Sequence, residues 1–106
     1  MLQTEIITLN GKEVTVTEAS LRMDMARTRW LETFWKPETD PEIKSYKFGY
    51  CYLAAVTLPL PTFDDYLDLS IADAEKWIET VSRLNPTFFP GTNPTMAVEA
   101  APPKAP

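Results

Sequence analysis

Apolar and polar residues alternate most clearly at the start of the chain, with the two-residue period of β-strands. Residues 4–9 and 12–16 both alternate, and Asn10-Gly11 between them predicts a type I′ hairpin because both central positions need φ > 0. A two-residue loop fixes the pairing, so Leu9 should face Lys12 and one face should collect the apolar side chains. These are Ile7, Leu9, Val14 and Val16. Because an isolated hairpin is only marginally stable in water, helices should follow and cover this face.

After residue 16 the spacing of apolar residues changes from the two-residue period of a strand to the three- and four-residue spacing of a helix. Thr17 is placed to cap this first helix, with Glu18 in its first turn. Pro37 disfavours helical backbone at Lys36, so the helix should end near Trp35 or Lys36. Apolar residues recur within it every three or four positions and predict a long amphipathic helix. They are Leu21, Met25, Ala26, Trp30, Leu31, Phe34 and Trp35.

A second helix should begin at Asp40-Pro41, which combines a capping carboxylate with proline at the first helical position, and should run to about Thr57. Its second half is apolar nearly all round, which predicts a central position in the molecule. One stripe comprises Ile43, Tyr46, Tyr50, Leu53 and Ala54, and another comprises Phe48, Tyr52 and Val56. Gly49 costs about 1 kcal/mol relative to alanine in a helix interior. We therefore expect another element to approach closely at Gly49, with a hinge as the alternative.

The segment 58–61 has proline at every second position and predicts an extended connector. Thr62 can then cap a short helix over 63–69, and Ser70 can cap a last helix that ends at Asn85-Pro86. The apolar face of this last helix comprises Ile71, Ala74, Trp77, Ile78, Val81 and Leu84. One continuous bent helix over 63–84 is the alternative.

These elements together predict an α+β fold that is mainly α. An N-terminal β-hairpin is followed by three or four packed helices and a flexible proline-rich C-terminal tail. The expected division is a single hairpin-plus-helices domain over residues 1–89 and a flexible tail over 90–106. Phe88 and Phe89 lie at this boundary, where they either fold back on the helices or stand exposed as an anchor for a partner.

The composition excludes most of the common catalytic and metal-binding sites, because the chain has no histidine and a single cysteine. Histidine-based triads, histidine metal ligands, intramolecular disulfides and cysteine-rich zinc sites are thereby excluded. Cys51 lies between two tyrosines in an uncharged stretch, which predicts a small buried hydrophobic residue. The sequence also has no glycine-rich phosphate loop, nucleophile elbow or Rossmann fingerprint. We therefore expect no enzyme activity, no catalytic residue and no cofactor.

The net charge of −5 is concentrated in residues 62–85, and we expect this acidic face mainly to keep the protein in solution. Its acidic residues are Asp64, Asp65, Asp68, Asp73, Glu75 and Glu79. Such a face could also bind a basic partner or mimic a nucleic-acid backbone, whereas direct nucleic-acid binding is not expected. The first three aspartates lack the alternating ligands and glycine of an EF-hand, so no metal site is predicted.

The longest uncharged run, 48–63, contains two prolines and falls short of the roughly 20 apolar residues that a membrane span needs. No basic flank with an apolar stretch opens the chain, and a lone cysteine suits a reducing compartment. A cytoplasmic protein that does not cross a membrane is expected.

The aromatic residues exceed what so small a core needs, and exposed aromatic residues often anchor protein interfaces. An interaction protein is therefore the favoured class, with simple filling of the core as the alternative. The candidate partner-binding residues are Trp30, Trp35, Tyr46, Tyr50, Phe88 and Phe89.

Three segments resemble tail assembly chaperones of long-tailed bacteriophages. They are the opening 7–16 with the helix that follows, the segment 60–67 (LPTFDDYL), and Trp77 with Leu84-Asn85-Pro86. The resemblance implies a small helical protein in the host bacterial cytoplasm. It would bind the phage tape measure protein and keep it soluble while the tail tube forms, with the tail tube protein as a second candidate partner and homo-oligomerisation left open.

Such chaperones are typically not enzymes, and the resemblance transfers no active-site residue. A tape measure protein is long and helical with apolar stripes, which an aromatic-rich helical surface could cover by helix-in-groove packing. The alternative function is a small acidic phage-encoded inhibitor that blocks a nucleic-acid site on a host enzyme, using the carboxylates of residues 62–85.

Overall fold

The computed structural model describes residues 2–88 and has the predicted α+β, mainly helical architecture. Residues 90–106, predicted as a tail, and Phe89 lie outside this range. The strands are β1 (Thr4–Leu9), β2 (Lys12–Thr17) and β3 (Thr57–Leu58). The helices are α1 (Leu21–Trp30), the π-helix η1 (Leu31–Trp35), α2 (Pro41–Ala54), α3 (Phe63–Leu67), α4 (Ile71–Leu84) and the 3₁₀ turn η2 (Pro86–Phe88).

The hairpin has the predicted register, with Leu9 opposite Lys12 and Ile7 opposite Val14. Asn10 and Gly11 have φ values of 51° and 81°, as a type I′ turn requires. The predicted apolar face is buried, whereas Ile6 on the opposite face is 64% exposed. Turn chemistry and strand alternation therefore determined this element.

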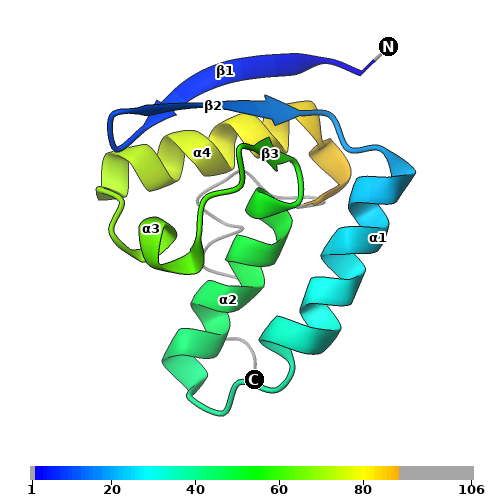
Figure 1. Cartoon of the computed structure of the whole chain (residues 1–106), viewed down its shortest axis with the longest axis vertical. Helices are drawn as coiled ribbons and strands as arrows, with labels where there is room; N and C mark the ends of the chain where they lie inside the picture. The colour runs from blue at the N-terminus through cyan, green and yellow to red at the C-terminus, as the bar shows by residue number, and fades with distance from the viewer. Residues whose placement is uncertain (1, 89–106) are drawn as a thin grey trace.

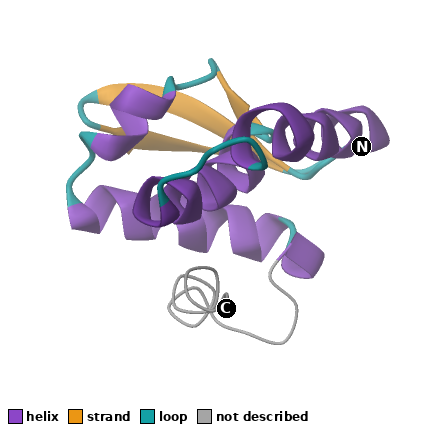
Figure 2. Cartoon of the chain, turned by 90° about the horizontal axis from the view of Figure 1, so that it is seen from below, coloured by secondary structure: helices purple, strands orange, loops and turns teal. Residues whose placement is uncertain are grey.

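The molecule has two layers, with the sheet on one side and the helices on the other. The helix α4 packs against β1 and β2 (Figure 1), and from below the helices lie in front of the strands (Figure 2). The core between the layers comprises Ile7, Leu9, Val14, Val16, Leu53, Val56, Trp77, Ile78 and Val81.

The strand β3 was not predicted, and the expected extension of the second helix to Thr57 is wrong. The helix α2 ends at Ala54, and Thr57 and Leu58 instead pair with Val16 and Thr15 of β2. The Thr17 backbone N–H donates to Val56 O at 2.9 Å and extends this pairing. The free edge of β2 thus competes with continuation of the helix, and the β-branched residues Val56 and Thr57 at this point favour extended backbone.

The first helix begins later than predicted. Thr17 belongs to β2, and the N-cap of α1 is Ser20, whose Oγ accepts from Met23 N at 3.2 Å. Thr17 is held in the strand because Asn85 Nδ2 donates to its carbonyl at 3.1 Å. The predicted end near Trp35 is confirmed, although the last turn is π-helical and Lys36 N donates to Leu31 O.

The predicted apolar stripe of the first helix is buried only in part, because Leu21 and Met25 are 86% and 61% exposed. No side chain of α1 or η1 is fully buried. Ile71, predicted on the apolar face of the last helix, is likewise 78% exposed. It is the first residue of α4.

The other caps are confirmed. Asp40 Oδ1 accepts from the N–H groups of Glu42 and Ile43, and Thr62 forms a reciprocal capping box with Asp65. Residues 63–84 form two helices rather than one bent helix, and α3 ends at Leu67, two residues before the predicted end. The predicted central half of α2 is buried at Tyr50, Cys51, Leu53 and Ala54.

Gly49 lies beside Tyr66 of α3, but the close approach expected there does not require glycine. A Cβ atom at this position would lie 3.5 Å from the Tyr66 hydroxyl, which is an ordinary van der Waals distance. Alanine would therefore fit at this position.

Candidate partner-binding surface

The helices α1 and α2 run antiparallel and extend away from the sheet (Figure 1). We call residues 21–47, which comprise α1, η1 and the first half of α2, the helical arm. Four large apolar side chains of this arm are exposed: Leu21 by 86%, Met25 by 61%, Ile43 by 39% and Tyr46 by 49%. Leu21 and Met25 are four residues apart in α1, and Ile43 and Tyr46 are three residues apart in α2. At these spacings the two side chains of each helix lie on the same side of it. The arm therefore presents apolar surface that its own fold leaves in contact with solvent.

An inner aromatic cluster joins the arm to the rest of the molecule. Its members are Phe34, Tyr50, Phe63, Tyr66 and Trp77. Neighbouring rings have centroids 5.4–6.0 Å apart and are mostly tilted or edge-on, which is the favourable geometry for aromatic pairs. The cluster connects η1, α2, α3 and α4 into one packed unit.

Tyr50 requires a correction, because the sequence suggested it as a partner-binding residue. It is 7% exposed, and its hydroxyl donates to the carbonyl of Pro61. Burial raises the pKa of Tyr50 to about 12 and that of Tyr66 to about 12. Both are core residues that stay protonated at neutral pH.

An outer aromatic cluster lies along another side of α2. It comprises Trp35, Phe48, Tyr52 and Phe88, with neighbouring centroids 5.1–5.5 Å apart. All four side chains are half-buried. Phe88 is thus docked against the helices, which is one of the two arrangements considered from the sequence.

Cationic side chains cover several of these rings. Arg27 Cζ lies 4.7 Å from the Tyr52 centroid, Lys44 Nζ lies 5.0 Å from that of Trp35, and Lys47 Nζ lies 4.3 Å from that of Phe34. Such cation–π contacts contribute roughly 0.5–1 kcal/mol each at exposed sites. They hold α1 and η1 against α2 by side-chain contacts at the margin of the arm.

An ion pair closes the loop between η1 and α2. Lys47 Nζ lies 2.7 Å from Glu38 Oε1, and both side chains are less than one-fifth exposed. The hydrogen bond from Lys47 is the main cause that lowers the pKa of Glu38, followed by the one from the Asp40 backbone. The arm is therefore tied at its tip by charge and along its length by aromatic contacts.

The other suggested contact residues are distributed along the arm and its base. Trp30 and Trp35 are half-buried, whereas Tyr46 is 49% exposed and has the most accessible ring among the members of the set that the structure describes. Phe89 lies outside the described residues. The structure therefore brings Trp30, Trp35 and Tyr46 onto one helical hairpin.

The sequence reasoning did not identify Leu21 and Met25 as surface residues. Their spacing instead placed them on the apolar side of an amphipathic helix. A signal against burial was present, since Arg22, Asp24 and Arg27 distribute polar groups around much of the same helix.

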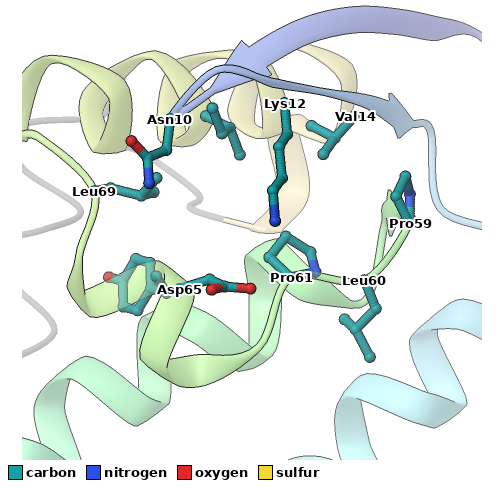
Figure 3. Close-up of a pocket in the computed structure, with 10 residues that line it drawn as sticks. Asn10, Lys12, Val14, Pro59, Leu60, Pro61, Asp65 and Leu69 are labelled. Atoms are coloured by element: carbon teal, nitrogen blue, oxygen red, sulfur yellow. The ribbon is translucent and has the colours of Figure 1, made fainter.

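A separate pocket of about 230 Å³ lies between the hairpin end, the proline connector and α3. Lys12 extends from β2 toward Pro61 and Asp65 (Figure 3), while Leu69 and Leu60 supply apolar walls. The Asp65 carboxylate also accepts from Thr62 N at 3.3 Å as part of the capping box. The pocket is small and mixed in character, and it lies apart from the arm.

Cys51 is fully buried, as predicted, and burial raises the pKa of its thiol to about 11. A thiol with this pKa is protonated at neutral pH and is a poor nucleophile. Among residues 2–88, no group of three or more histidine, cysteine, aspartate or glutamate side chains is arranged to hold a metal ion. None of the helices in the same range has the length and apolar character that crossing a bilayer requires.

Comparison with protein-family models, with curated proteins and with solved structures finds no match to this chain.

Proposed function

We propose that this protein is a phage tail assembly chaperone that binds helical segments of the tape measure protein and keeps them soluble during tail morphogenesis. The proposal combines the sequence resemblance of segments 7–16 and 60–67 with the exposed apolar surface of the helical arm. The bound segment would contribute the apolar face of an amphipathic helix, and the binding mode would be helix-in-groove packing.

One observation carries the proposal: Leu21 and Met25 lie one turn apart on a helix that buries none of its side chains fully. Covering a leucine or methionine side chain contributes roughly 1.5–3 kcal/mol. Covering the exposed parts of these two side chains can therefore contribute about 2–4 kcal/mol of binding free energy, which is more than tenfold in affinity. Their exposure at helical spacing suits a helical partner.

The acidic inhibitor has weaker support, because local structure already accounts for part of the acidic cluster. Asp65 closes the capping box of α3, and Asp73 Oδ2 accepts from Asn10 N at 2.8 Å. Two of the carboxylates thus stabilise the fold, which reduces the set that could imitate a row of phosphates.

The test is co-expression with the tape measure protein of the same phage. The wild-type protein should raise the soluble yield of the tape measure protein and co-purify with it. The double variant Leu21→Asp/Met25→Asp should lose both effects, since it places two charges on the proposed contact surface. The matched control is Ile71→Asp, which alters a 78% exposed residue that begins α4, just as Leu21 begins α1.

Each outcome bears on a different part of the proposal. An unchanged soluble yield and no co-purification with the wild-type protein would overturn the chaperone function. Full activity of the double variant would exclude the arm as the contact surface. Equal loss in Ile71→Asp would show a general effect of added charge rather than a specific site.

A further inference from the structure

The sheet has two edges, formed by β1 and β3, with β2 between them. Leu9 and Lys12 flank a two-residue loop and form a hydrogen-bonded pair, so the odd-numbered residues of β1 bond to β2. The bond from Glu18 N to Gln3 O at 2.7 Å continues this pattern. The backbone N–H and C=O groups of Thr4, Ile6 and Thr8 therefore point away from β2, along the edge of the sheet.

The two edges differ in how they are protected against pairing. The strand β3 has only two residues and is followed by Pro59, which lacks the N–H that pairing needs. The strand β1 has six residues, pairs without a bulge and contains no proline or lysine. Proteins usually block an unused edge with a short strand, proline, lysine, a bulge or an unpaired charge. The strand β1 has none of these, because its one charged residue, Glu5, is ion-paired with Arg83 of the same chain, so this edge is suited to pairing.

We propose that β1 pairs antiparallel with β1 of a second copy of this chain, about a two-fold axis at Ile6. In this register Thr4, Ile6 and Thr8 of one copy lie opposite Thr8, Ile6 and Thr4 of the other. The backbone N–H and C=O groups that these residues direct away from β2 can then all form hydrogen bonds between the two copies. The same surface serves both copies, which is the arrangement of a closed dimer.

The side chains of the edge are complementary to themselves. Pairs of β-branched residues, Ile6 with Ile6 and Thr4 with Thr8, stabilise antiparallel sheets when directly opposite. The one charged residue of β1, Glu5, would face Ile7 of the second copy and is ion-paired with Arg83 of its own chain. A register centred on Glu5 would place two carboxylates opposite one another, so charge favours the register centred on Ile6.

The pairing would also extend an apolar row on the outer face of the sheet. Ile6 is opposite Thr15, and Thr15 is opposite Leu58, so these side chains form a line across the three strands. Ile6 and Leu58 are 64% and 60% exposed. A two-fold axis at Ile6 joins the two rows end to end. This dimer does not depend on the chaperone function, because it uses the sheet rather than the helical arm.

The experiment measures the mass of the isolated protein by sedimentation equilibrium over a concentration series. The wild-type protein should approach twice its monomer mass of 12.0 kDa. Ile6→Lys should weaken the dimer by at least about tenfold, since it replaces an apolar pair with two facing charges. Leu58→Lys is the matched control, because it makes the same change on the same face at the opposite edge. It should leave the dissociation constant unchanged.

Amide hydrogen exchange provides a second measurement that does not depend on a variant. The N–H groups of Thr4, Ile6 and Thr8 should become more protected as the concentration of wild-type protein rises. The circular dichroism spectrum of Ile6→Lys should remain that of the folded protein, since Ile6 is largely exposed.

Several results would overturn the proposal. They are a monomeric wild-type protein at millimolar concentration, a dimer in which these amides stay unprotected, and a dimer equally weakened by both lysine variants. A monomeric protein whose β1 amides become protected only when the tape measure protein binds would assign this edge to a partner strand instead.

Discussion

Trp77 shows how single residues connect distant parts of this chain. Its side chain is fully buried, and its Nε1 donates to Thr57 Oγ1 at 2.9 Å. The same hydroxyl donates to Leu53 O at 2.7 Å. One threonine thereby satisfies a buried indole N–H and holds α4, β3 and the end of α2 together.

Thr57→Val should destabilise the protein by about 1–3 kcal/mol, because it keeps the shape of the side chain but leaves the Trp77 N–H buried without its acceptor. Urea unfolding followed by tryptophan fluorescence measures the change. Thr39→Val, at an exposed position of the loop between η1 and α2, should change the free energy of unfolding much less. Equal stability of Thr57→Val and the wild-type protein would contradict this role.

At the scale of elements, the connection between β2 and α1 is positioned by the end of α4. Asn85 is 6% exposed, its Oδ1 accepts from Ala19 N at 2.7 Å, and its Nδ2 donates to Thr17 O. The amide side chain thus bonds to both sides of the connection, and it does so across more than sixty residues of sequence. The start of α1 depends on this tertiary contact as well as on its own cap.

Asn85→Ala should lower the free energy of unfolding by about 1–3 kcal/mol, since two backbone groups lose their partner. The amide of Ala19 should also exchange faster with solvent, which hydrogen exchange by NMR can detect at that one site. Glu79→Ala, at an exposed position of the same helix, serves as the control and should leave the Ala19 amide protected. Unchanged protection in Asn85→Ala would show that Asn85 does not fix the connection.

At the scale of the whole molecule, the two layers are joined at the surface by an ion pair between β1 and α4. Arg83 donates to both carboxylate oxygens of Glu5. The hydrogen bond from Arg83 is the main cause that lowers the pKa of Glu5, and the same bond raises the pKa of Arg83. The pair links residues near opposite ends of the described chain.

This pair should make stability depend on pH in acid. Because the folded state lowers the pKa of Glu5 from its ordinary value of 4.5, the stabilisation is complete at neutral pH and is lost as the pH falls through the folded-state pKa. Glu5→Gln should therefore have a lower melting temperature than the wild-type protein at pH 7, with the difference shrinking toward pH 3.

The expected difference is small, since both side chains are solvent-accessible, and added salt should reduce it further. Glu13→Gln, at an exposed position of β2, is the control and should show no comparable pH-dependent difference. A Glu5→Gln difference that persists undiminished at pH 3 would contradict the assignment to this ion pair.

Prediction from the sequence succeeded where the information is local. Asn10-Gly11, Asp40-Pro41 and Ser70 each act on backbone within a few residues, and the structure places a turn or a helix start at each. The prediction failed at the start of the first helix, where Thr17 and Ser20 are both adequate caps. The contact with the distant Asn85 selects Ser20. The candidate site was predicted in part: Tyr46 is exposed, whereas Tyr50 is buried beneath α3 and the proline connector.

The sequence by itself determined the hairpin, its register, the order of the helices and the class of fold, because turn, cap and periodicity signals act over short distances. Only the tertiary structure decided that Thr57 and Leu58 form a strand, since that strand exists through pairing with β2. It also decided that Leu21 and Met25 face solvent. Helical periodicity shows which residues share a side of a helix, but burial depends on whether another element covers that side, and the described elements leave this side of α1 uncovered.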